Sequence, residues 1–121
     1  MKRLESISQV GEIVQASATK PQLIFKHSTR CSISAAAKHR LDADLAALNV
    51  QMDVHFLDLL AHKDISAIVA DRFGVRHESP QVILIDKGQV ALHLSHYDIE
   101  STRILKATSS QEQRKGGGSH W

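Results

Sequence analysis

The sequence has a single cysteine, Cys31, and little that marks an exported or membrane protein. One cysteine cannot form an internal disulfide, which fits a reducing compartment. No apolar run is long enough to cross a bilayer, and the charged, polar N-terminus lacks the apolar core of a signal peptide. We therefore expect a cytoplasmic protein with no membrane partner.

Aromatic residues and excess charge are also scarce. The chain has three Phe, one Tyr and one Trp, and its formal net charge at pH 7 is +2. Nucleic-acid-binding proteins usually gather basic residues on one face and offer aromatic rings for base stacking. The basic residues here are scattered, so nucleic acid is not an expected partner. No Cys/His cluster has the spacing of zinc ligands, so no metal site is expected.

Length and composition indicate one globular domain. A chain of 121 residues suits a single core, and 42% hydrophobic with 23% charged residues is ordinary for a globular protein. The last six residues, Gly-Gly-Gly-Ser-His-Trp, resemble a linker or a purification tag. We assign residues 1–110 to the domain and residues 111–121 to a C-terminal tail that includes these tag-derived residues, 116–121.

The hydrophobic pattern predicts an α/β domain. Apolar spacings of three and four predict helices, and short apolar or alternating runs predict strands. Asp64 and Asp98 are expected to cap the third and fourth helices, and Gly74 to end the third. The helices are expected from residue 4 to before residue 19, over 32–48 and 65–73, and after residue 98. Strands are expected over 22–27, 53–58, 81–86 and 90–95. This order predicts a mixed four-stranded sheet flanked by helices on both faces.

Cys31 lies between the first expected strand and the second expected helix. Amides in the first turn of a helix and the helix dipole favour a thiolate, which is the reactive form of cysteine. The alternative is a small buried hydrophobe, as most free cysteines are. Ser34 follows three residues later and is either an ordinary first-turn serine or a hydroxyl that donates a hydrogen bond to the sulfur. Unlike a second cysteine, it cannot resolve a mixed disulfide.

Three segments resemble a known family. Residues 73–82, Phe-Gly-Val-Arg-His-Glu-Ser-Pro-Gln-Val, resemble the thioredoxin segment that leads to its cis-proline, and residues 86–90 resemble its hairpin turn. Residues 25–34, Phe-Lys-His-Ser-Thr-Arg-Cys-Ser-Ile-Ser, are similar to the active-site stretch of the YtxJ-like monothiol bacilliredoxins. The resemblance covers roughly residues 1–110. Family members often carry proline after the cysteine, where this sequence has Ser32.

The resemblance implies a thioredoxin-like thiol–disulfide oxidoreductase that removes bacillithiol from mixed disulfides on client proteins, or adds it. Cys31 and Ser34 match the catalytic positions. Bacillithiol is then a co-substrate, no prosthetic group is implied, and the partners are thiol-modified clients and a low-molecular-weight thiol. We carry this activity forward as the principal expectation.

The resemblance also implies a substrate-binding set. Pro80 would be cis and would leave the backbone of Ser79 free to pair with an extended substrate. Thr29, Arg30 and Ser32 border the thiol. Arg30 either stabilises the thiolate, binds a carboxylate of the small thiol, or is an ordinary solvated arginine.

Two alternatives are binding proteins. The first is an iron–sulfur carrier of the monothiol glutaredoxin type, which uses glutathione and a Cys-Gly-Phe-Ser cysteine. Ser32 and Ile33 replace the Gly and Phe, which argues against it. The second is a non-catalytic interaction domain of thioredoxin fold in which Cys31 is inert. The thiol pKa of Cys31 distinguishes this alternative from the enzyme.

Overall fold

The structure, a computed structural model, describes residues 1–108, and a five-stranded mixed sheet forms its centre. Its strands lie in the order β1-β3-β2-β4-β5. β2 pairs parallel with β3 and antiparallel with β4, and β5 pairs antiparallel with β4. The strands are β1 (Lys2–Arg3), β2 (Gln22–His27), β3 (Asp53–Asp58), β4 (Gln81–Asp86) and β5 (Gln89–Ser95).

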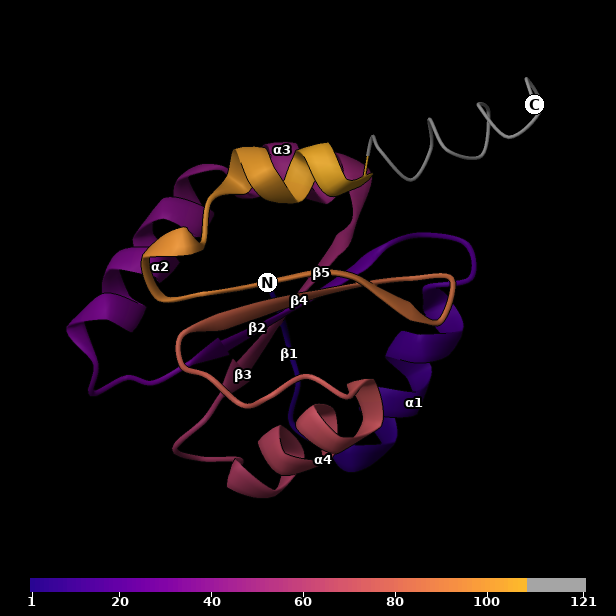
Figure 1. Ribbon diagram of the computed structural model, residues 1–121, viewed down its shortest axis with the longest axis horizontal. Helices are drawn as coiled ribbons and strands as arrows, with labels where there is room; N and C mark the ends of the chain where they lie inside the picture. The colour runs from indigo at the N-terminus through magenta and orange to yellow at the C-terminus, as the bar shows by residue number, and fades with distance from the viewer. Residues whose placement is uncertain (109–121) are drawn as a thin grey trace.

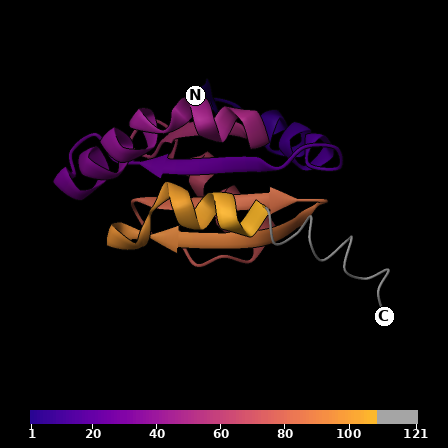
Figure 2. The ribbon, with the colours of Figure 1, turned by 90° about the horizontal axis from the view of Figure 1, so that it is seen from above.

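Helices cover both faces of this sheet, as predicted (Figure 1). One layer contains α2 (Ser32–Ala43), α3 (Leu45–Gln51) and a helix over residues 101–108. The other contains α1 (Ile7–Ala16) and α4 (Lys63–Phe73). Figure 2 looks onto the first layer and shows the 101–108 helix beside α2 and α3. The arrangement confirms the thioredoxin-like α/β class, with five strands where four were predicted.

The extra strand, β1, has only two residues, which is too short to leave a periodic signal in the sequence. It pairs parallel with β3 at the edge of the sheet. The first helix therefore begins at Ile7 instead of near Leu4, with Ser6 as its N-cap. Leu4 is buried before the helix starts, which explains why it fits the apolar pattern.

The predicted helix over residues 32–48 is two helices that meet at Asp44. The backbone of Asp44 leaves the helical region, with φ −105° and ψ 10°. Leu41 and Leu48, on either side of the break, are both fully buried. Because the apolar stripe continues across the break, the pattern alone could not reveal it.

The two aspartates predicted as caps lie elsewhere. α4 begins at Lys63 after His62, so Asp64 is in its first turn, where its charge still suits the helix dipole. Asp98 ends a 3₁₀ turn, η1 (His96–Asp98), and the last helix begins at residue 101. Arg40 of α2 donates hydrogen bonds of 3.2 and 3.1 Å to the carbonyl of Ile99, which fixes η1 against α2. Gly74 does end α4 in the left-handed conformation, with φ 63°.

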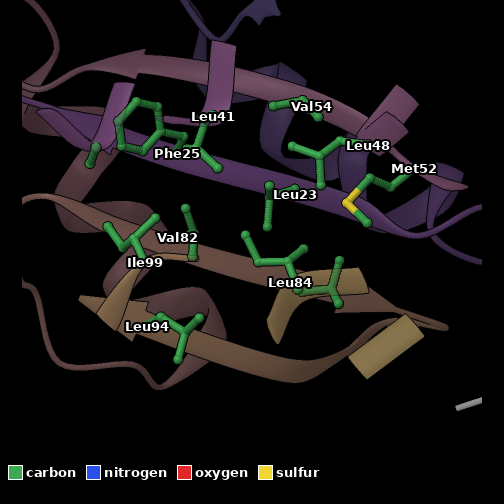
Figure 3. Close-up of a cluster of buried hydrophobic side chains, with 12 residues drawn as sticks. Leu23, Phe25, Leu41, Leu48, Met52, Val54, Val82, Leu84, Leu94 and Ile99 are labelled. Carbon is green, nitrogen blue, oxygen red and sulfur yellow. The ribbon is translucent and has the colours of Figure 1, made fainter. Parts of the chain in front are cut away.

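The sheet separates two apolar clusters. Leu23 and Phe25 of β2 point into the cluster beneath α2 and α3, shown in Figure 3 with Leu41 and Leu48. Ile24 points into the opposite cluster, beneath α1 and α4. Every residue of β2 is buried, as expected for a central strand with both faces covered.

Within residues 1–108, no helix is long and apolar enough to cross a membrane. The predicted domain boundary at residue 110 and the tail lie outside the described residues.

Candidate thiol site

Cys31 is the N-cap residue of α2, four residues beyond the end of β2. Its own amide donates to the carbonyl of Ser28 at 3.1 Å, and its carbonyl accepts from the amide of Ala35 at 3.0 Å. These two bonds fix the cysteine between a tight turn and the first turn of the helix. The residue is half-buried, so part of it is accessible from solvent.

The helix start lowers the pKa of the Cys31 thiol. The backbone amide of Ser34 contributes most, partial burial opposes the shift, and the Ile33 amide and the Ser34 hydroxyl add to the lowering. A thiolate is therefore favoured by groups of the first turn, as the sequence indicated. Arg30 is exposed and is not among the sources of this shift, so its suggested stabilisation of the thiolate finds no support.

Ser34 is fully buried beside the thiol. Its Oγ accepts a hydrogen bond of 3.3 Å from the amide of Ser28. Because this bond uses a lone pair, the hydroxyl proton is free to be donated to the sulfur. Ser34 therefore connects the loop before Cys31 to the helix after it, and contributes to the lowered thiol pKa.

Three predicted substrate-binding residues lie on the surface within two positions of Cys31 in the chain. Thr29 and Arg30 lie in the loop, and Ser32 opens α2; all three are exposed. Their side chains can meet a substrate without any rearrangement of the core.

The Ser79–Pro80 peptide bond is cis, as predicted. Lys26 pairs with Gln81 across β2 and β4, so Pro80 lies beside the end of β2 from which the Cys31 loop departs. The Pro80 carbonyl accepts from the amide of His96 at 3.0 Å. Within residues 1–108, neither the amide nor the carbonyl of Ser79 takes a hydrogen bond, and its buried hydroxyl also has no partner. Ser79 thus offers unpaired backbone groups at the thiol end of the sheet.

The last two residues of β2 point to opposite faces, which the sequence did not resolve. His27 packs beneath α2 against Phe25 and Phe56, with ring centroids 5.6 and 5.3 Å away. Burial, followed by the nearby Lys38, lowers the pKa of His27 and so favours the neutral imidazole. Lys26 points the other way, toward α4. The sequence showed only a Lys-His pair at the end of an apolar strand, which does not tell which face each side chain meets.

Within residues 1–108, no group of three or more His, Cys, Asp or Glu side chains could hold a metal ion. The site that the described residues form contains a thiol with a lowered pKa at the start of α2 and the unpaired backbone groups of Ser79 before the cis-proline.

Comparison with known families identifies the family of this chain. The family described as monothiol bacilliredoxin BrxC matches residues 2–104. The chain belongs to the monothiol bacilliredoxin family. This bacilliredoxin has only Cys31 to supply the thiol of a thiol–disulfide oxidoreductase.

Solved structures show the same fold. A protein assigned as an oxidoreductase with a thioredoxin fold is 29% identical, with a TM-score of 0.78, over 88% of this chain and 91% of its own. Fasciola hepatica thioredoxin is 14% identical, with a TM-score of 0.68, over 91% of this chain and 98% of its own. Thioredoxin f from spinach chloroplast is 16% identical, with a TM-score of 0.67, over 90% of each chain. This bacilliredoxin is a thiol–disulfide oxidoreductase of thioredoxin fold.

Proposed function

We propose that this bacilliredoxin removes bacillithiol from mixed disulfides on client proteins, with Cys31 as the nucleophile. The observation that carries the proposal is a sole cysteine whose thiol pKa is lowered by the first turn of α2. Membership of the monothiol bacilliredoxin family supports bacillithiol as the small thiol of this proposal. A reducing compartment such as the cytoplasm suits this reaction, because the enzyme starts from a free thiol.

The reaction is a thiol–disulfide exchange. The Cys31 thiolate attacks the bacillithiol sulfur, a bond forms between these two sulfurs, and the bond between bacillithiol and the client breaks. The electron pair of the broken bond leaves on the client sulfur, which takes a proton from solvent and is released reduced. Cys31 then carries bacillithiol as a mixed disulfide. In the opposite direction the same exchange places bacillithiol on a client.

A second thiol must clear Cys31, because Ser34 has an oxygen where a dithiol enzyme has its second sulfur. That thiol is either another bacillithiol, which leaves as the symmetrical disulfide, or a thioredoxin-like partner enzyme. The role proposed for Ser34 is to stabilise the thiolate through its hydroxyl, both before attack and when Cys31 leaves.

The substrate is proposed to bind across the exposed loop and the Ser79–Pro80 segment. The unpaired amide and carbonyl of Ser79 suit an extended client backbone, since each can exchange one hydrogen bond with it. Arg30 is exposed beside the thiol and suits a carboxylate of the small thiol. Thr29 and Ser32 supply neutral hydroxyls at the same place.

Intact-mass spectrometry of a mixture with a bacillithiol-modified client protein tests the proposal. We expect one bacillithiol adduct on the enzyme and one reduced client per enzyme molecule, after which the reaction stops until bacillithiol is added. Cys31→Ala should form no adduct and release no client. A glutathione-modified copy of the same client tests the choice of small thiol, and should react more slowly.

Two results would contradict the proposal. One is continued turnover by the wild-type enzyme with no added thiol or partner. The other is client reduction by Cys31→Ala at the wild-type rate.

A further inference from the structure

Lys26 is a fully buried lysine, with none of its surface exposed. It lies next to the end of β2 and points toward α4, on the face of the sheet opposite α2. Among residues 1–108 no carboxylate forms an ion pair with it. An ammonium group without a carboxylate is costly to bury, and an apolar side chain would pack there more favourably. We therefore expect the lysine at this position to have a functional role.

The Lys26 ammonium joins two other parts of the chain. Its Nζ donates to the carbonyl of Ser66 in α4 at 3.3 Å and to Nδ1 of His77 at 3.3 Å. An ammonium has only donors, so Nδ1 of His77 must accept, and the proton of the neutral imidazole lies on Nε2. The Ser66 hydroxyl is also 3.3 Å from this Nδ1. His77 belongs to the segment that runs from the end of α4 to the start of β4 (Figure 1).

Gln81, the cross-strand partner of Lys26, holds the same segment from β4. Its Nε2 donates to the carbonyl of Arg76 at 3.0 Å, and its Oε1 accepts from the amide of Glu78 at 3.4 Å. Two buried side chains on neighbouring strands thus hold residues 76–78, which lead directly into Ser79. This segment has no helix or strand of its own, and these bonds hold it together with a contact of 3.3 Å between Oε2 of Glu78 and Nδ1 of His96.

We propose that Lys26 is a positioning residue that, through His77, holds the segment 76–79 so that the backbone of Ser79 is placed to receive an extended client. The inference rests on the proposed function, because it assigns a purpose to the client-binding segment. A pre-positioned segment loses less conformational freedom on binding, and this lowers the KM without changing the chemistry at Cys31.

The test separates client binding from thiol chemistry. The client is a peptide that carries a bacillithiol mixed disulfide, with added bacillithiol for turnover, and kcat and KM are measured separately. The reactivity of Cys31 itself is followed with a small aromatic disulfide that has no peptide backbone. For Lys26→Met we expect KM to rise at least fivefold, while kcat and the aromatic-disulfide rate stay within twofold of wild type.

A second variant, at an exposed residue, keeps the test decisive if the Lys26→Met protein does not fold. His77→Leu removes the acceptor of Lys26 from an exposed position, and we expect the same rise in KM. His93→Leu is the matched control, since His93 on β5 is also exposed and, within residues 1–108, its side chain makes no hydrogen bond to residues 76–79. Its KM should equal that of the wild type.

The outcomes distinguish the two proposals. If wild type turns over but neither variant changes KM, the inference is overturned and the proposed function stands. If kcat and the aromatic-disulfide rate fall together with client turnover, Lys26 acts on the thiol or on the whole fold, and the inference is again overturned. If wild type does not act on the peptide at all, the proposed function fails and the inference fails with it.

Discussion

The amide of Ser28 lies 3.3 Å from Oγ of Ser34 and donates a hydrogen bond to it. This bond fastens the loop before Cys31 to the helix after it, so the sulfur faces the amides of Ile33 and Ser34. The same two groups, with the Ser34 hydroxyl, lower the thiol pKa of Cys31. One buried serine therefore supports both the geometry and the electrostatics of the site.

Removal of the Ser34 hydroxyl should make Cys31 a weaker nucleophile at neutral pH. In Ser34→Ala the thiolate loses one hydrogen bond and the Ser28 amide loses its acceptor, so the thiol pKa rises. We expect the rate of iodoacetamide alkylation at pH 7 to fall a few-fold. The exposed neighbour provides the control, because Ser32→Ala removes a hydroxyl that is not among the sources of the shift. Equal rates for both variants would refute this role of Ser34.

A second substitution at Ser34 should convert the mechanism from one thiol to two. In Ser34→Cys the new sulfur lies one helical turn from Cys31, where a short disulfide becomes possible. We expect bacillithiol on Cys31 to be displaced internally, which leaves a disulfide and releases free bacillithiol. Mass spectrometry would show an enzyme two hydrogens lighter in place of the adduct. A stable adduct on Ser34→Cys would mean that the two side chains do not reach each other.

Alanine substitutions at two glycines should change the free energy of unfolding in opposite directions. Gly74 has φ 63°, and a Cβ added there would meet open space, so alanine is disfavoured by the backbone conformation and not by a clash. We expect Gly74→Ala to lower the free energy of unfolding by about 1 kcal/mol. Gly11 lies within α1, also with open space, and Gly11→Ala should raise that free energy by about 0.5–1 kcal/mol. Urea unfolding of both variants measures the difference, and changes of the same sign would contradict it.

Lys26 should reduce stability at neutral pH. Burial lowers the pKa of Lys26 from 10.5 to about 8, so the folded protein binds this proton more weakly than the unfolded chain. A difference of that size corresponds to a cost of at most about 3 kcal/mol. The cost is complete below about pH 8 and disappears as the pH rises toward 10.5, because neither state then holds the proton.

Lys26→Met should therefore unfold at higher urea concentration than wild type at pH 7, and this gain should shrink above pH 8. Lys63→Met, at an exposed lysine of α4, should show no such gain. A loss of stability in Lys26→Met at pH 7 would show that the hydrogen bonds of the ammonium outweigh its burial.

The sequence was most informative where one local signal decided the structure. β2, β3 and β4 were predicted at their observed bounds, because compact apolar or alternating runs ended at turn residues. The helix break at Asp44 was not predicted, because the apolar stripe continues across it. Strand β1 was not predicted, because two residues are too few to show a periodic pattern. The face of the sheet to which Lys26 points could not be predicted for a different reason. Since all six residues of β2 are buried, alternation gave no sign of which face each side chain meets.

The candidate site also contains features that the sequence predicts and features that it does not. Cys31, Ser34 and the cis bond before Pro80 could be predicted from short motifs. The contacts of Lys26 with Ser66 and His77 depend on how β2, α4 and the 76–79 segment pack together, which no local pattern encodes.

The pH dependence of Cys31 alkylation tests the central claim most directly. Because Cys31 is the only cysteine, iodoacetamide reports on that thiol alone, and intact mass confirms a single modification. The account predicts a midpoint clearly below the value of about 8.5 for an unstructured cysteine, and a higher midpoint for Ser34→Ala. A wild-type midpoint at or above 8.5 would make Cys31 an ordinary thiol and contradict its proposed role as the nucleophile.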